Sequence, residues 1–327
     1  MAIVNALDQG PQLNFWGVSY GTVLGQVAAS MFPDRIGRML LDGNLRADDY
    51  ATTQWLTSFA GAELCPLADY HGRNTSGKSL MRSFDEKFQS LRNESPGGLN
   101  ATESELRLTN AHLLKASIMT ELYVPQAYPS IASRIEGLFM GNETAMLPPD
   151  EGSLNTGWNV LDDVFPGIAC SDTSFRAEDP DDQFSMYQAH ISQGSFAETT
   201  FPSRFQCAQW KFAAAEQIDL NKLRDLKTSS PILVVNSRYD PITSLSGAWE
   251  MSSQLRGSRV VVHQGVGHGL INHSSNCTQD AVTRYFVDGK MPELNTTCLP
   301  NMNAFEYAHL KISKARKNDT KQPEIAK

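Results

Sequence analysis

Residues 13–32, LNFWGVSYGTVLGQVAASMF, constrain the fold more than any other part of the chain. An apolar run there ends in the motif GVSYG at residues 17–21, and a stretch with helical spacing follows it. Glycines allow the backbone to turn tightly enough to lift the side chain of Ser19 clear of a strand end. The segment therefore predicts a strand, a sharp turn and a helix, whose sheet-facing positions are Val23, Leu24, Val27 and Ala28.

Three further apolar runs read as buried strands. RIGRMLLDG follows Pro33, which ends the first helix, and PILVVNS and SRVVVHQ lie beyond residue 230. Segments with helical spacing separate these runs or follow them, and strands that alternate with helices in this way form parallel sheets. We therefore expect an α/β protein, specifically the α/β-hydrolase fold, because the serine motif stands at a strand-to-helix turn.

The middle of the chain has a different pattern. Residues 45–226 show amphipathic helices and polar loops without strand alternation, which predicts a helical lid inserted into a core formed by residues 1–44 and 227–310. The short basic tail, residues 311–327, is predicted to be disordered. Three helix faces carry the lid prediction: Leu56, Phe59 and Ala60; Leu80, Phe84, Phe88 and Leu91; Ile131, Ile135, Leu138 and Phe139.

A serine hydroxyl needs a general base and a carboxylate that orients the base before it becomes a nucleophile near neutral pH. In this fold they follow the serine in the order acid, then histidine, each beyond a later strand. Asp240 follows PILVVNS and His268 follows SRVVVHQ, so we predict Ser19, Asp240 and His268 as the catalytic triad. The backbone N–H of Tyr20 is predicted to bind the oxyanion.

Each partner has a competitor in the sequence. Asp42, at the end of RMLLDG, occupies the other strand end from which this fold can draw its acid. His263 lies within a strand pattern and His273 lies in a loop rich in glycosylation motifs, whereas His268 is flanked by two glycines. We therefore prefer Asp240 and His268 and retain the others as alternatives.

At these motifs the chain resembles the tripeptidyl-aminopeptidase-like secreted serine hydrolases, which are related to proline iminopeptidases. NFWGVSYGTVLG, PDRIGRMLLDG, PILVVNSRYDPIT and the GVGHG loop carry the resemblance, together with the cysteines around the last helix. It implies a serine exopeptidase that releases short N-terminal peptides or single residues, with Ser19, Asp240 and His268 in the roles given above.

Compared with that family, the chain looks N-terminally truncated, because Ser19 lies close to residue 1. The family's first strands and its second oxyanion donor precede the nucleophile. We therefore expect a missing N-terminal segment, an exposed apolar strand edge, and weak or absent activity of this chain by itself.

Composition and motifs limit the kinds of partner that the chain can bind. A formal net charge of -8 argues against binding to nucleic acid, and no apolar run is long enough to span a membrane. No metal or cofactor motif occurs, so we expect no cofactor and no metal. The expected partner is a peptide or a small ester or amide substrate.

Cysteines and glycosylation motifs point to a secreted protein, although no signal peptide opens the chain. Cys277 and Cys298 bracket the last core helix and Cys170 and Cys207 bracket a loop-rich stretch, so we predict these two disulfides. Cys65 is then left over, either as a buried thiol or as a residue whose partner lies outside this chain. The predicted N-glycosylation sites are Asn74, Asn93, Asn100, Asn142, Asn272, Asn276, Asn295 and Asn318.

Three functions remain open at this stage. The first is hydrolysis of N-terminal peptide bonds or esters through an acyl-enzyme on Ser19. The others are a small-molecule pathway hydrolase or esterase, and an inactive truncated hydrolase fold that serves as an interaction protein. An aminopeptidase also requires a carboxylate that receives the substrate's ammonium group, for which the candidates are Glu63, Asp162, Asp163 and Asp172.

Overall fold

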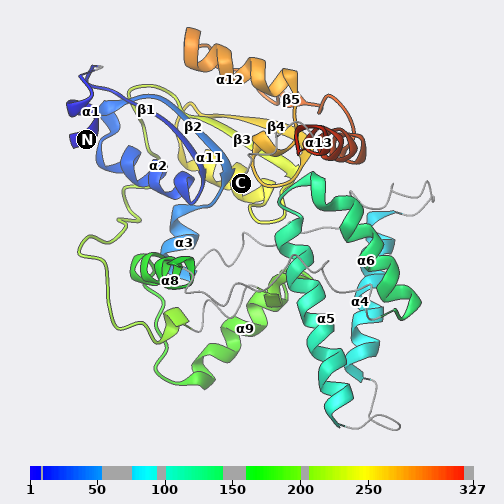
Figure 1. The fold of residues 1–327 in the computed structure, drawn as a ribbon. Coiled ribbons are helices and arrows are strands. Elements are labelled where there is room, and N and C mark those ends of the chain that lie inside the picture. The colour runs from blue at the N-terminus through cyan, green and yellow to red at the C-terminus, as the bar shows by residue number, and fades with distance from the viewer. Residues whose placement is uncertain (9, 54–75, 94–100, 143–159, 200–205, 320–327) are drawn as a thin grey trace, which may run out of the picture.

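Five parallel strands form the single sheet seen in the computed structural model, which describes residues 1–8, 10–53, 76–93, 101–142, 160–199 and 206–319 (Figure 1). The strands follow one another across the sheet in chain order. They are β1 (Leu13–Ser19), β2 (Ile36–Asn44), β3 (Leu233–Tyr239), β4 (Arg259–Val266) and the short β5 (Thr297–Cys298). The parallel arrangement expected from the sequence is therefore present.

Helices cover both faces of this sheet (Figure 1). On one face, α2 (Tyr20–Met31) and α11 (Leu245–Gln254) pack through Ala29, Ala248 and Met251 against alternate strand residues such as Met39 and Val234. On the other face, α12 (Asn276–Asp288) contributes Val282 and Tyr285 to a core with Leu40, Val235 and Val261. Apolar side chains on both faces explain why these strands read as nearly continuous apolar runs.

The buried face of α2 differs from the one predicted. Leu24 is 52% exposed, whereas Thr22, Val23, Gly25, Gln26 and Ala29 are buried. The difference arises because Gln26 faces the turn after β2, where its Nε2 donates to Leu45 O at 2.7 Å and its Oε1 accepts from the Ala47 N–H at 3.1 Å. A buried glutamine that satisfies backbone groups is invisible to a search for apolar periodicity.

The described elements between β2 and β3 are helices and 3-10 turns, which lie to one side of the sheet (Figure 1), and we refer to this helical region as the lid. Phe84, Phe88, Ile131, Ile135 and Leu138 are buried in one cluster, whereas Phe139 is 41% exposed. The predicted face of Leu56, Phe59 and Ala60 lies outside the described residues. The helices are α3 (Ala47–Thr53), α4 (Gly77–Asn93), α5 (Ala101–Glu121), α6 (Tyr128–Met140), α8 (Val160–Asp172) and α9 (Phe184–Ile191).

The C-terminal tail departs from the prediction of disorder. Helix α13 runs over Ala304–Asp319, so that residues 311–319 are helical, and the rest of the tail lies outside the described residues. The helix starts with a reciprocal cap, in which Asn303 Oδ1 accepts from the Glu306 N–H and Glu306 Oε2 accepts from the Asn303 N–H. Burial of Tyr307 and Ala308 then anchors its first turns. The prediction of disorder was based on the basic composition of the later residues and did not take the anchored start of the helix into account.

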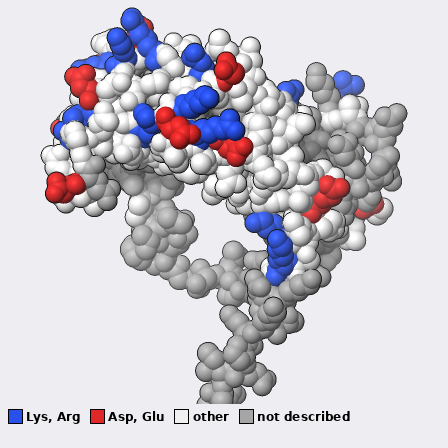
Figure 2. Space-filling view, turned by 90° about the horizontal axis from the view of Figure 1, so that it is seen from above, with Lys and Arg blue, Asp and Glu red and all other residues white. Residues whose placement is uncertain are grey.

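The remaining described elements are short: α1 (Ala2–Ala6) and the 3-10 turns η1 (Pro33–Arg35), η4 (Pro125–Ala127), η5 (Pro180–Gln183), η6 (Ala197–Thr199) and η7 (Leu270–Asn272). Among the described helices, none is long and apolar enough to cross a membrane. Figure 2 shows acidic and basic side chains interspersed over the described part of one face, without a field of a single sign in that view.

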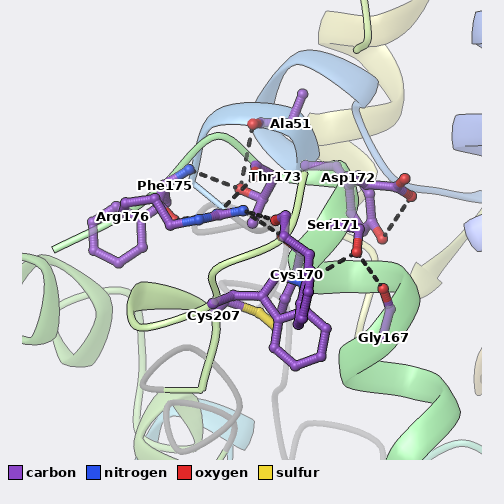
Figure 3. Close-up of a disulfide and its surroundings, with 12 residues drawn as sticks. Ala51, Gly167, Cys170, Ser171, Asp172, Thr173, Phe175, Arg176 and Cys207 are labelled. Atoms are coloured by element: carbon purple, nitrogen blue, oxygen red, sulfur yellow. Dashed lines mark hydrogen bonds between the residues drawn. A yellow bond between two sulfur atoms is a disulfide. The ribbon is translucent and has the colours of Figure 1, made fainter. Parts of the chain in front are cut away.

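Two disulfides connect distant parts of the chain: Cys170 pairs with Cys207, and Cys277 pairs with Cys298. These are the two pairs predicted from the sequence; Cys65 lies outside the described residues. The second disulfide ties the start of α12 to β5. The first fixes the C-terminal end of α8 in the lid, where Asp172 follows two residues later (Figure 3).

Candidate active site

Ser19 stands at the sharp turn between β1 and α2. Its backbone has φ 57° and ψ −122°, a strained combination for a residue with a side chain, and a strand-to-helix serine turn of this kind exposes the hydroxyl. Gly17 is required by close approach, because a Cβ there would lie 2.3 Å from Gly21 O. A Cβ at Gly21 would meet nothing within 4 Å. Only the first glycine of the motif is therefore demanded by these contacts.

Tyr20 is the first residue of α2, directly after the turn. The first N–H groups of a helix lack partners within the helix and lie at the positive end of its dipole. An oxyanion that forms beside Ser19 Oγ would lie next to this helix start. This arrangement suits a role of the Tyr20 N–H as oxyanion donor.

His268 is paired with Asp240. His268 Nδ1 lies 2.9 Å from Asp240 Oδ2 and 3.0 Å from Oδ1. Both residues are buried, and the carboxylate is fixed by the N–H groups of Ile242, Thr243 and Gly269 at 2.9, 2.8 and 3.3 Å. A carboxylate held in this way fixes the orientation of the imidazole and favours the tautomer with its proton on Nδ1.

The alternative acid and histidines have other partners. Asp42 accepts from the Leu270 N–H with both oxygens at 3.1 Å, and no described bond joins it to His268. His263 Nδ1 lies 3.0 Å from Thr278 Oγ1, and His273 Nε2 lies 2.9 Å from Met302 O. The geometry thus favours Asp240 and His268 over their competitors.

The His268 loop reaches the ends of β1 and β2. A Cβ on Gly269 would lie 3.4 Å from Val18 Cγ1, so the residue after His268 lies near the residue before Ser19. Gly43 lies against the imidazole itself, since a Cβ there would be 3.1 Å from His268 Cε1. His268 Nε2 is buried and has no hydrogen-bond partner among the described residues. The nitrogen that a general base would use is therefore unoccupied.

The lid also holds His268, through Tyr123 near the end of α5. Tyr123 O accepts from the His268 N–H at 2.9 Å, and the tyrosine ring meets the imidazole edge-on, with ring centroids 5.1 Å apart. Tyr123 is not among the site residues predicted from the sequence. No local signal marks it, because its role depends on how the lid packs on the core.

A pocket of about 480 Å³ opens beside Ser19. Its wall is largely apolar and comes from both the core and the lid, with Leu45, Met119, Tyr123, Phe165, Ile168 and Ile242 among the lining residues. An apolar pocket next to a nucleophile is the common form of a small-substrate site.

Asp172 lies behind two tyrosines of this pocket. Tyr20 Oη donates to Asp172 Oδ2 at 2.8 Å and Tyr50 Oη donates to the same oxygen at 3.4 Å. Burial and the neighbouring Asp172 raise the pKa of both phenols, which keeps them neutral donors. Within the described part of the chain no cation pairs with this carboxylate. Of the other predicted ammonium acceptors, Glu63 and the side chains of Asp162 and Asp163 lie outside the described residues.

Electrostatics differ among the site's ionisable groups. Burial alone would lower the pKa of His268, but the charge and hydrogen bond of Asp240 and the charge of Asp42 outweigh it and raise that pKa. Burial raises the pKa of Asp42 to about 7. Burial lowers the pKa of His263 to about 4, which favours a neutral imidazole.

The predicted glycosylation sites fall into two groups. Asn142, Asn276 and Asn295 are exposed. Asn272 is not, and its Nδ2, the atom that would carry a glycan, donates to His268 O. The side chains of Asn74, Asn93, Asn100 and Asn318 lie outside the described residues. Among the residues that the structure describes, no group of three or more His, Cys, Asp or Glu side chains is arranged to hold a metal ion.

Comparison with known proteins finds one matching family model and several similar proteins. A family model described as TAP-like protein matches residues 193–298. A tripeptidyl aminopeptidase of Streptomyces lividans is 23% identical over 318 residues, which cover 91% of this chain and 57% of the relative. A serine protease of Mycobacterium tuberculosis is 22% identical over 88% of this chain and 58% of the relative, and a carboxylesterase B of the same organism is 24% identical over 55% and 35%. The chain thus spans little more than half the length of the first two.

The family match, the relatives and the parallel sheet flanked by helices together support one assignment. The fold is that of the α/β-hydrolases, and the known proteins that resemble the chain are hydrolases of peptidase or esterase type.

Proposed function

We propose that this TAP-like serine hydrolase cleaves the peptide bond near the free N-terminus of short peptides, through an acyl-enzyme on Ser19. The observation that carries the proposal is the His268–Asp240 pair, which leaves His268 Nε2 unpartnered beside the strand that ends in Ser19. In this proposal Asp240 and His268 are the catalytic acid and base, and the Tyr20 N–H is the oxyanion donor.

The proposed reaction has two steps. Ser19 Oγ attacks the substrate carbonyl while His268 Nε2 removes the hydroxyl proton, and the Tyr20 N–H stabilises the oxyanion. His268 then protonates the leaving amine, whose departure leaves an ester on Ser19. In the second step His268 activates water, which hydrolyses this ester and restores the free hydroxyl.

Asp172 supports the choice of a substrate with a free amine. Its carboxylate is held by Tyr20 and Tyr50, which both line the pocket, and it has no cationic partner in the described structure. Tyr20 is also the neighbour of Ser19 in the chain. A substrate ammonium bound near Asp172 would therefore be placed a short distance from the nucleophile, as cleavage close to the N-terminus requires.

The second candidate is an esterase. The apolar wall of the pocket favours it, since Leu45, Met119 and Ile242 offer no charged group to a peptide backbone. We propose the same triad for both activities. We further propose that the protein is secreted, since two disulfides join distant segments and such bonds persist in oxidising compartments.

The test compares tripeptide p-nitroanilides with a free or an acetylated amine, in the parent enzyme and in Asp172→Asn. We expect a preference for the free amine that Asp172→Asn reduces by roughly tenfold or more, mainly through KM. Asp179→Asn is the matched control, because Asp179 caps η5 and bonds neither tyrosine. Equal rates on both substrates, together with efficient hydrolysis of p-nitrophenyl esters, would favour the esterase.

A further inference from the structure

A second buried carboxylate, Asp42, lies beside the acid–base pair without belonging to it. Asp42 and Asp240 occupy the ends of neighbouring strands, β2 and β3, and both are almost fully shielded from solvent. A buried carboxylate is costly and needs a compensating partner. The reaction steps proposed above leave Asp42 without a role.

The partner of Asp42 is the backbone of the His268 loop. Its two oxygens accept from the Leu270 N–H at 3.1 Å, while Asp240 Oδ2 accepts from the Gly269 N–H at 3.3 Å. The two carboxylates thus hold consecutive N–H groups immediately after the histidine. Removal of either would release one of the two anchors of this turn.

We propose that Asp42 is a positioning residue for His268, which holds the backbone N–H of Leu270 and adds a buried carboxylate to the surroundings of the acid–base pair. The inference rests on the proposed role of His268 as general base. The two neighbouring carboxylates then have different roles. Asp240 bonds the imidazole, whereas Asp42 holds the loop and contributes to the electric field at the imidazole.

Charge supports this separation of roles. Burial is the largest influence on the pKa of Asp42, which is raised to about 7. The charge of Asp240 also raises this pKa, whereas the Leu270 N–H, the charge of His268 and the Trp16 side chain lower it. These are the groups that face Asp42 from β1, β3 and the loop after β4. The Asp42 charge in turn raises the pKa of His268, so the charge states of the two groups depend on each other.

The variant Asp42→Asn tests the charge and keeps the acceptor, since its amide oxygen can still bind the Leu270 N–H. The first readout is the pKa of the His268 imidazole, followed by NMR without substrate and assigned by comparison with His268→Gln. We expect this pKa to fall by roughly half a unit or more in Asp42→Asn. An unchanged pKa in a folded variant would overturn the proposal.

The second readout is kinetic. In Asp42→Asn the acid limb of kcat/KM against pH should move to lower pH, with activity retained on its plateau. Asp42→Ala removes the acceptor as well, and kcat should fall roughly tenfold or more while the asparagine variant restores it. Equal kcat in both variants would refute the positioning role. If the parent shows no Ser19-dependent turnover, the proposed function fails, and the NMR titration still decides whether Asp42 acts on His268.

Discussion

Gly43 lies against His268 so closely that a Cβ on the glycine would sit 3.1 Å from Cε1 and 3.3 Å from Nδ1 of the imidazole. The same Cβ would be 3.4 Å from Asp240 Oδ2. Gly43 also has φ +62°, a conformation that favours glycine. One small residue at the end of β2 thus leaves room for the acid–base pair.

Gly43→Ala should therefore lower both activity and stability. The left-handed backbone costs about 1 kcal/mol for alanine, and the methyl group must push the imidazole away from its position. We expect kcat/KM to fall roughly tenfold or more, measured beside thermal melting.

Gly141→Ala is the matched control for this substitution. Gly141 has φ +70° at the C-cap of α6, and a Cβ there would meet nothing within 4 Å. It should lose similar stability but keep its kcat/KM. Equal losses of activity in the two variants would show that backbone strain, and not contact with His268, is responsible.

Asp240→Asn should nearly abolish turnover. The asparagine amide would disfavour the tautomer that leaves Nε2 free to accept a proton, and a change of this type lowers kcat by roughly 10⁴-fold in serine hydrolases. KM should change little. If Asp42→Asn lowers kcat as much as Asp240→Asn does, the choice between the two carboxylates is wrong.

Stability should depend on pH through Asp42. Its pKa of about 7 in the folded chain lies above the ordinary 3.8, so the folded state holds this proton more tightly than the unfolded state does. The resulting stabilisation is complete below about pH 3.8 and is lost as the pH rises from there to about 7. Asp42→Asn cannot ionise, so its stability relative to the parent should be higher at pH 8 than at pH 4, by on the order of 1 kcal/mol or more.

Thermal melts at several pH values measure this difference. His268 contributes in the same direction in both proteins, because its pKa is also raised in the folded state. Because Asp42→Asn is also expected to lower the pKa of His268, the NMR titration supplies the contribution of the histidine, and the remaining difference reports Asp42. If the melting temperatures of the two proteins change with pH by the same amount across this range, the placement of a titrating acid at this position is contradicted.

Local sequence signals predicted the strand-to-helix turn at Ser19 and the parallel sheet. Both follow from patterns a few residues long, such as an apolar run that ends at a glycine-flanked serine. The candidates Asp240 and His268 could also be found, because strand ends in a parallel sheet lie at one edge. The order of the residues along the chain then restricted the choice.

Tertiary packing hid the other features. Tyr123 contacts His268 only because the lid folds back onto the core, and Asp172 reaches Tyr20 across 152 positions of the chain. Helix α2 was assigned the wrong face at Leu24 because the buried residue Gln26 is polar. Helix α13 was missed because its anchoring residues precede a basic stretch.

Labelling with a fluorophosphonate, followed by intact mass, tests the central claim that His268 activates Ser19. One adduct should form on the parent chain, none on Ser19→Ala, and labelling of His268→Gln should be slower by roughly a thousandfold or more. Labelling that persists in Ser19→Ala, or proceeds at the parent rate in His268→Gln, would contradict the account.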